Sequence, residues 1–206
     1  MLPMRVLFRW SGLAMALAAL CTGQANAETV IRKSYSYFAI QGRTADDLDH
    51  ELDRRGPQIS TTGSRHPGLT RIRFGGTIDY LHGSNRCAVG GVKVTLNIKV
   101  ILPRWKNRAH AERGLGLVWD TLAADIKRHE ERHAEIAKQY ARQLETALKT
   151  LRPEKTCEAL QEKVAETTDK ITDAHTADQI RFDRVEALNF NNRIMRLLKY
   201  RATQTR

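Results

Sequence analysis

Residues 92–102 read VKVTLNIKVIL, the most regular alternation of apolar and polar residues in the chain. Six apolar residues occupy alternate positions and would share one face of an extended strand: Val92, Val94, Leu96, Ile98, Val100 and Leu102. Four of the five residues between them are polar, so the opposite face suits solvent. The pattern predicts a half-buried antiparallel strand, which Pro103 ends.

The segments upstream predict the rest of a small sheet. Two further strands are expected over residues 33–41 and 69–80. Between them, Thr44 followed by Asp47 resembles an N-terminal capping pair, which predicts a short helix.

The segments downstream predict two helices. A long helix is expected from about residue 115 to residue 151, because apolar residues recur at steps of three and four. Pro153 breaks it, and a second helix starts near Thr156 and continues past Val185. A connection this short makes the two helices antiparallel neighbours. The expected fold class is therefore α+β, with a small antiparallel sheet packed on a long two-helix antiparallel hairpin.

The first 27 residues have the features of a secretory signal peptide. Arg5 and Arg9 lie near the start, an apolar run follows, and Ala25-Asn26-Ala27 forms a small-x-small cleavage site. The apolar run is too short to span a bilayer core of roughly 30 Å. We therefore expect cleavage after Ala27, a single domain over residues 28–206, no transmembrane segment after cleavage, and a periplasmic or secreted location.

Two cysteines remain once the signal peptide has been removed. They are Cys87 and Cys157, an even pair in a compartment that permits disulfides. A bond between them would close a loop of about 70 residues and stabilise the fold by roughly 4 kcal/mol in the chain-entropy model. Two unrelated buried thiols are the alternative.

The composition is basic, with a formal net charge of +11. Such a charge favours anionic partners, including acidic polymers of the cell envelope. Nucleic acid is not an expected partner, because an exported protein rarely meets it and the chain has neither zinc-finger spacing nor an aromatic-basic signature.

Residues 129–133 read His-Glu-Glu-Arg-His and match the H-E-x-x-H pattern. Residues four apart on a helix lie one turn apart, so the imidazoles of His129 and His133 can reach one zinc ion. Glu130 can then act as general base, taking a proton from a metal-bound water that attacks a peptide carbonyl. Two hydrogen-bonded core histidines are the alternative interpretation.

A third metal ligand has to come from outside the motif. Folding the two helices about residue 153 places residue 173 opposite His133, and this simple geometry favours His175. Asp183 and Glu186 lie one to three turns further along the same helix. Each of these side chains could instead belong to a solvated helix face.

Taken together, the landmarks of the chain resemble a bacterial family of predicted secreted zinc-dependent proteases. The shared landmarks are the signal peptide, Cys87, Leu-Pro-x-Trp at residues 102–105, Trp119, the H-E-x-x-H motif and Cys157. The resemblance implies a zincin-like fold, a zinc cofactor and peptidase activity.

The same resemblance bears on the third ligand. The family pattern near the C-terminus is an aromatic-Asp pair followed by Thr-x-His-Gly; Phe182-Asp183 matches the pair, but the histidine is missing here. The resemblance therefore implies that Glu186 or Asp183 replaces that histidine. Glu186 ranks first, because a downstream helical glutamate completes many two-histidine zinc sites.

The sequence supports two hypotheses for the function of the protein. The first is a secreted or periplasmic zinc peptidase acting on a peptide or cell-envelope substrate, with strand 92–102 lying beside the cleft and pairing with the substrate. The alternative is a non-catalytic envelope binding protein with an incomplete metal site, for which the missing histidine is the supporting feature.

Overall fold

The computed structural model of the chain describes residues 26–58, 63 and 65–204. Within these residues there are three strands, three α-helices and a 3₁₀ turn at Arg108–His110. The elements are β1 (Asn26–Ile40), α1 (Ala45–Arg55), β2 (Leu69–Gly83), β3 (Arg86–Trp105), α2 (Arg113–Lys149) and α3 (Cys157–Gln204). The predicted signal peptide lies outside the described residues, except that its last two positions begin β1.

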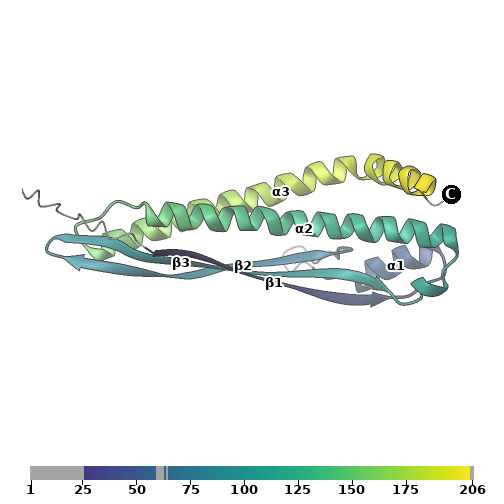
Figure 1. The fold of residues 1–206 in the computed structure, drawn as a ribbon, viewed down its shortest axis with the longest axis horizontal. Helices are drawn as coiled ribbons and strands as arrows, with labels where there is room; N and C mark the ends of the chain where they lie inside the picture. Colours follow the sequence, from purple (N-terminus) through teal and green to yellow (C-terminus); the bar gives the residue numbers. More distant parts are fainter. Residues whose placement is uncertain (1–25, 59–62, 64, 205–206) are drawn as a thin grey trace, which may run out of the picture.

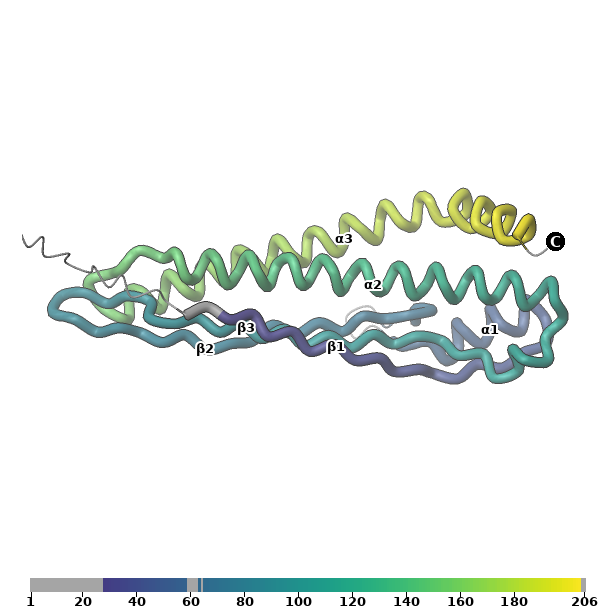
Figure 2. The backbone as a smooth tube through the Cα atoms, in the orientation of Figure 1, coloured from purple at the N-terminus to yellow at the C-terminus, as the bar shows by residue number. Residues whose placement is uncertain are grey.

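The elements form an elongated α+β structure in which α2 lies along one face of the sheet (Figure 1). From the end of α2 the chain turns at residues 150–156, and α3 runs back alongside α2 (Figure 2). The predicted two-helix hairpin is therefore wrong as a description of the helical part. The fold class named only the two long helices, although α1, the short helix predicted from the capping pair, packs at the far end of the sheet, and α3 is 48 residues long against 37 for α2. No helix in the described part of the chain is long and apolar enough to cross a membrane.

The sheet is mixed, which corrects the prediction of an antiparallel sheet. Its strand order is β1-β3-β2, so β3 is the central strand. A tight turn leads from β2 directly into β3, and Asn85 in that turn has a left-handed φ of 56°. β3 is therefore antiparallel to β2, but it lies between β2 and β1 and runs parallel to β1. Both edges of β3 are occupied, so this strand is not the one that pairs with a substrate.

The alternating residues of β3 form the main core, as predicted. The six apolar side chains that alternate from Val92 to Leu102 are all 4% exposed or less. They pack against α2, where Ala134, Ala137 and Ala141 are fully buried and let the helix approach the sheet closely. The rigid contact between β3 and α2 fixes the position of the histidine motif, which lies in the middle of α2.

A second cluster closes the far end of the molecule. Trp105 and Trp119 meet edge to face, with ring centroids 5.8 Å apart, and α1 contributes Leu48 and Leu52. The predicted capping pair is confirmed, because Thr44 accepts a hydrogen bond from the backbone N–H of Asp47 and the Asp47 carboxylate accepts one from the backbone of Thr44.

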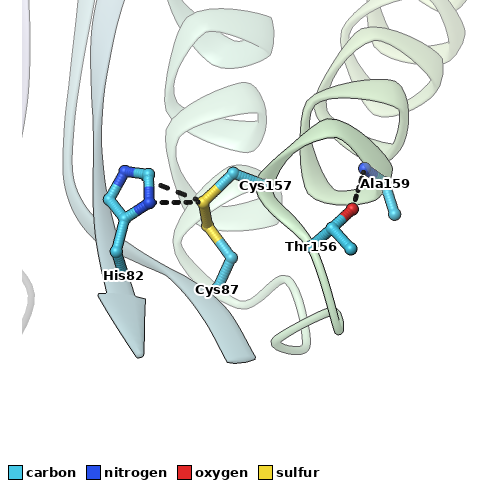
Figure 3. The surroundings of a disulfide bond; sticks show 5 residues. All are labelled: His82, Cys87, Thr156, Cys157 and Ala159. Carbon is cyan, nitrogen blue, oxygen red and sulfur yellow. Dashed lines mark hydrogen bonds between the residues drawn. A yellow bond between two sulfur atoms is a disulfide. The ribbon is translucent and has the colours of Figure 1, made fainter. Parts of the chain in front are cut away.

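The predicted disulfide is confirmed between Cys87 and Cys157, whose Cα atoms are 5.1 Å apart (Figure 3). It joins the start of β3 to the first residue of α3. Two backbone hydrogen bonds between Cys87 and Glu154 support it, of 2.7 and 2.9 Å. The beginning of α3 is thus attached to the sheet covalently and through the backbone.

Candidate metal centre

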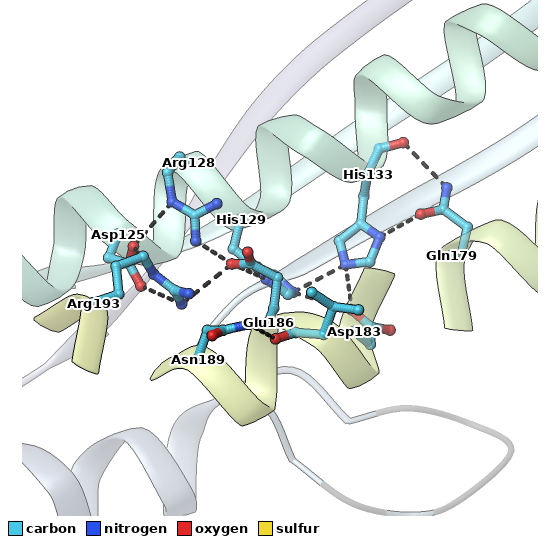
Figure 4. Close-up of polar contacts among 10 residues, drawn as sticks. Asp125, Arg128, His129, His133, Gln179, Asp183, Glu186, Asn189 and Arg193 are labelled. Atoms are coloured by element: carbon cyan, nitrogen blue, oxygen red, sulfur yellow. Dashed lines mark hydrogen bonds and ion pairs between the residues drawn. The ribbon is translucent and has the colours of Figure 1, made fainter. Parts of the chain in front are cut away.

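The two histidines of the motif point their Nε2 atoms toward one another and toward α3 (Figure 4). The distance between His129 Nε2 and His133 Nε2 is 3.0 Å. From α3, Asp183 Oδ1 lies 3.0 Å from His133 Nε2 and 3.3 Å from His129 Nε2. Three ligand atoms of a tetrahedral zinc ion, each bound at about 2.0–2.1 Å, lie roughly 3.3 Å apart. The two nitrogens and one oxygen therefore match the spacing and the chemistry of a zinc ligand set.

The electrostatics of these groups also suit a cation. Burial raises the pKa of Asp183, but hydrogen bonds from His129 and His133 outweigh it, and the pKa lies well below the usual range. Burial lowers the pKa of His133, but the Asp183 carboxylate and Gln179 outweigh it and the net shift is upward. Asp183 thus stays ionised and favours positive charge between the imidazoles, and a divalent cation competes there with a proton.

The structure brings Asp183 to the histidines, and it does not bring Glu186 or His175. Glu186 contacts Arg128, and its Oε2 is 3.2 Å from Arg193 Nη2. Glu186 Oε2 lies 3.7 Å from His129 Nδ1, whereas Asp183 faces the other ring nitrogen, Nε2.

His175 lies further back along α3, where its Nε2 is 2.8 Å from Gln179. Gln179, not residue 173, faces His133, so the chain folds about residue 156 rather than 153. A shift of three residues in the turn moves every facing residue by six, which is why residue 173 and its neighbour His175 do not lie opposite His133.

Glu130 is buried beside the metal centre, with 5% of its surface exposed. The Thr70 hydroxyl donates to Glu130 Oε2 at 2.7 Å, and it also lies 2.9 Å from the Glu130 backbone oxygen. Burial raises the pKa of Glu130, while the Thr70 hydrogen bond and the two imidazoles oppose that rise only in part. A carboxylate whose pKa moves toward neutrality is suited to accept and return a proton.

Gly68 makes room for this carboxylate. A Cβ at position 68 would lie 2.8 Å from Glu130 Oε1 and 2.8 Å from a methyl group of Ile126. The backbone before β2 therefore packs directly against the candidate base, and only glycine leaves the space that it occupies.

The metal centre opens into a cleft of about 500 Å³. One wall is formed by residues 66–70 and Ile72, which lead into and begin β2. The opposite wall comes from α3, with Gln179, Asp183, Glu186, Ala187, Phe190 and Arg193. His129, Glu130 and His133 lie at the base between these walls, so a ligand in the cleft would contact the motif.

Sequence reasoning missed three residues that shape the site. Thr70 holds Glu130, Gln179 contacts His133, and Phe182 packs on both histidines. The Phe182 ring stacks on His129 with centroids 5.0 Å apart and meets His133 edge-on at 5.1 Å. A signal was present for one of them, Gln179, because His175, Gln179 and Asp183 are spaced by four and share one helix face.

Fold and site together define an α+β protein with an H-E-x-x-H candidate metal centre closed by an aspartate. Residues 35–190 match the family described as "Bacterial protein of unknown function (DUF922)", and the chain belongs to this family. The matched range contains both histidines, Glu130, Thr70, Gln179 and Asp183. No curated protein and no solved structure matches the chain.

Proposed function

We propose that the protein is an exported zinc-dependent peptidase of the cell envelope, related in its site to the zincin peptidases. The observation that supports this most strongly is the convergence of His129 Nε2, His133 Nε2 and Asp183 Oδ1 within 3.3 Å, next to a buried glutamate. The disulfide fits a protein that folds in an oxidising compartment.

In this proposal His129, His133 and Asp183 hold the cation. A bound zinc ion supplies Lewis acidity toward a carbonyl and lowers the pKa of water. Glu130 accepts a proton from the attacking water and delivers it to the leaving amine, which its raised pKa favours. Thr70 holds Oε2 in place, so Oε1 is the oxygen available for proton transfer.

A peptide in extended conformation is the substrate that the cleft suits. β2 is an edge strand, and its outer edge pairs with no other strand in the described part of the chain. Its first residues, Leu69, Thr70 and Ile72, line the cleft. A substrate backbone that adds to this edge is brought alongside Glu130, in the manner of β-strand addition. In the proposed complex the substrate therefore pairs with β2, and not with β3 as expected from the sequence.

Metal content and hydrolysis test the two parts of this proposal separately. The purified exported protein is expected to hold one equivalent of zinc by elemental analysis, and His133→Ala is expected to lose it. Glu130→Gln is expected to keep the zinc while hydrolysis of fluorescently labelled casein falls by roughly 10²–10⁴-fold. Glu131→Gln is the matched control, because Glu131 contacts Lys33 and Tyr35 of β1 and does not line the cleft.

The outcomes distinguish an enzyme from a binding protein. Hydrolysis that survives Glu130→Gln would remove Glu130 from the mechanism. If the native protein binds zinc but cleaves neither casein nor cell-wall peptides, the non-catalytic envelope binding protein becomes the better assignment.

A further inference from the structure

Gln179 lies between the metal-facing histidine His133 and the buried histidine His175. Its side-chain oxygen is 2.5 Å from His133 Nδ1, and its side-chain nitrogen is 3.1 Å from the His133 backbone oxygen. The same nitrogen is 2.8 Å from His175 Nε2. One amide thus makes three contacts, and the two that join it to His133 are drawn in Figure 4.

These contacts determine which atoms carry hydrogen. A backbone carbonyl can only accept, so the amide atom facing the His133 backbone oxygen has to be the NH₂ group. The amide oxygen then faces His133 Nδ1 and can only accept, so Nδ1 carries a proton. The lone pair of a neutral His133 ring is therefore on Nε2, the atom that faces His129 and Asp183.

The second hydrogen of the Gln179 NH₂ group determines which nitrogen of His175 carries a proton. His175 Nε2 has to accept this hydrogen, so the neutral ring of His175 carries its proton on Nδ1. The ring is held in place by edge contacts with Phe74 of β2 and Tyr140 of α2, with centroids 5.1 and 5.6 Å away. The His133 backbone oxygen, which can only accept, keeps the Gln179 amide from flipping, and His175 accepts its other hydrogen.

We infer that Gln179 is a positioning residue for the candidate metal centre, with its amide oriented by the His133 backbone oxygen and its second N–H accepted by His175. The proton that Gln179 accepts from Nδ1 directs the other ring nitrogen of His133, Nε2, at the cation site. Partners of the second nitrogen of a metal-bound histidine typically change metal affinity by 10–100-fold when they are removed. The inference deepens the proposed function, since a peptidase would need this cation site.

The first experiment is made on the zinc-free protein and does not depend on metal binding or activity. In the full-length protein labelled with ¹⁵N-histidine, two-bond ¹H–¹⁵N correlation spectra report which ring nitrogen is protonated. His133 is expected to carry a proton on Nδ1, which faces the Gln179 oxygen, whether or not Nε2 also carries one toward Asp183, and His175 is expected to carry a proton on Nδ1. An unprotonated Nδ1 of His133 would overturn the inference, even if the protein binds zinc.

The second experiment measures zinc affinity by competition with a chromophoric chelator. Gln179→Leu is expected to weaken zinc binding by about 10–100-fold, because Nδ1 loses its acceptor. Gln179→Glu keeps an acceptor for Nδ1 but loses the donor to the His133 backbone oxygen, so its zinc affinity is expected to fall by less than about tenfold. Gln161→Leu, an exposed glutamine of the same helix, is the control and is expected to change nothing.

The two experiments separate this inference from the proposed function. Equal zinc affinity of native protein and folded Gln179→Leu would refute the positioning role. If Gln179→Leu does not fold, the ring spectra of the native protein and the affinity of Gln179→Glu still decide the question. A native protein that binds no zinc but shows the expected Nδ1 protons would refute the peptidase and leave the histidine–amide arrangement intact.

Discussion

The two halves of α3 are attached to the rest of the molecule by different means. In the first half, up to His175, the helix is joined to β3 by the Cys87–Cys157 disulfide, Leu160 is fully buried, and Val164 and Ile171 pack against the main core. In the second half, the contacts to α2 are mostly polar and come from the site, while several large apolar residues are exposed. These are Ile180, Val185, Leu188, Met195 and Tyr200.

The comparison shows that the covalent and apolar contacts of α3 and its candidate metal ligand lie in different halves of the helix. Covalent and apolar contacts hold the half of α3 that contributes no residue to the candidate metal centre. The half that carries Asp183 depends on charged groups such as Arg193, which binds Asp125 through both carboxylate oxygens at 2.9 and 3.1 Å. Assembly of the metal centre and docking of this second half are thus expected to be one event.

Removal of the disulfide should give the largest decrease in the free energy of unfolding. The bond joins residues 70 apart in sequence, and the chain-entropy model assigns such a loop about 4 kcal/mol. The Cys87→Ser/Cys157→Ser double variant is therefore expected to lose about 4 kcal/mol in the free energy of unfolding, measured by urea denaturation. Its zinc stoichiometry should be unchanged, because the metal centre belongs to the other half of α3. Loss of zinc in a variant that remains folded would show that the two halves are not independent.

Truncation of leucines in the two halves should give the next largest effect. Leu160 is fully buried, and Leu160→Ala is expected to cost about 3 kcal/mol. Leu188 is 79% exposed, and Leu188→Ala should change the free energy of unfolding by less than about 0.5 kcal/mol. Thermal unfolding of the two variants compares the halves directly. Similar losses at both positions would mean that the second half is covered in solution.

Zinc loading should stabilise the second half selectively. At a free zinc concentration 100 times the dissociation constant, binding adds about 2.7 kcal/mol to the free energy of unfolding. Hydrogen exchange, compared before and after treatment with a chelator, should show the greatest gain in protection around Gln179 to Glu186. If zinc changes the hydrogen-exchange protection of both halves of α3 equally, the two halves are not stabilised separately.

The ionic contact at Asp125 should have the smallest of these effects, and it should depend on pH. Burial raises the pKa of Asp125, but hydrogen bonds from Arg193 and Arg128 outweigh it, so the net shift is downward. A lowered folded-state pKa gives stability that is present above the unfolded value of about 3.9 and is lost as pH falls through the folded value.

The corresponding variant is Asp125→Asn, which is expected to lose about 2 kcal/mol at neutral pH. The difference from the native protein should shrink as the pH falls below about 4. Denaturation series from pH 7 to pH 3 measure both quantities, and Asp169→Asn, an exposed change on α3, is the control. If the difference in the free energy of unfolding between the two proteins grows toward low pH, the pKa of Asp125 is not lowered in the folded protein.

Local patterns in the sequence were sufficient to predict several parts of the structure. The alternation from Val92 to Leu102 identified the buried face of β3, because a strand has a period of two whatever its neighbours are. The spacing of His129 and His133 placed two imidazoles together, since one helical turn fixes their separation. The pair Cys87 and Cys157 followed from the predicted export of the chain.

Relations between distant segments were not available from the same patterns. Alternation in β3 does not reveal that the strand inserts between β1 and β2, because its apolar face would be the same beside either neighbour. The geometric choice of His175 depended on the length of the turn before α3, whereas the ranking of Glu186 before Asp183 came from the family resemblance and used no geometry. His175, Gln179 and Asp183 are spaced by four residues and share one helix face. This spacing identifies the residues that face His133 only when the partner helix is already known.

The absence of a side chain at Gly68 has a consequence for comparing members of this family. A methyl group at this position would lie 2.8 Å from Glu130 Oε1 and 2.8 Å from a methyl group of Ile126, so one of these side chains has to shift. A relative with alanine or a larger residue at this position, some sixty residues before the motif, therefore has to place the corresponding glutamate or its neighbour differently.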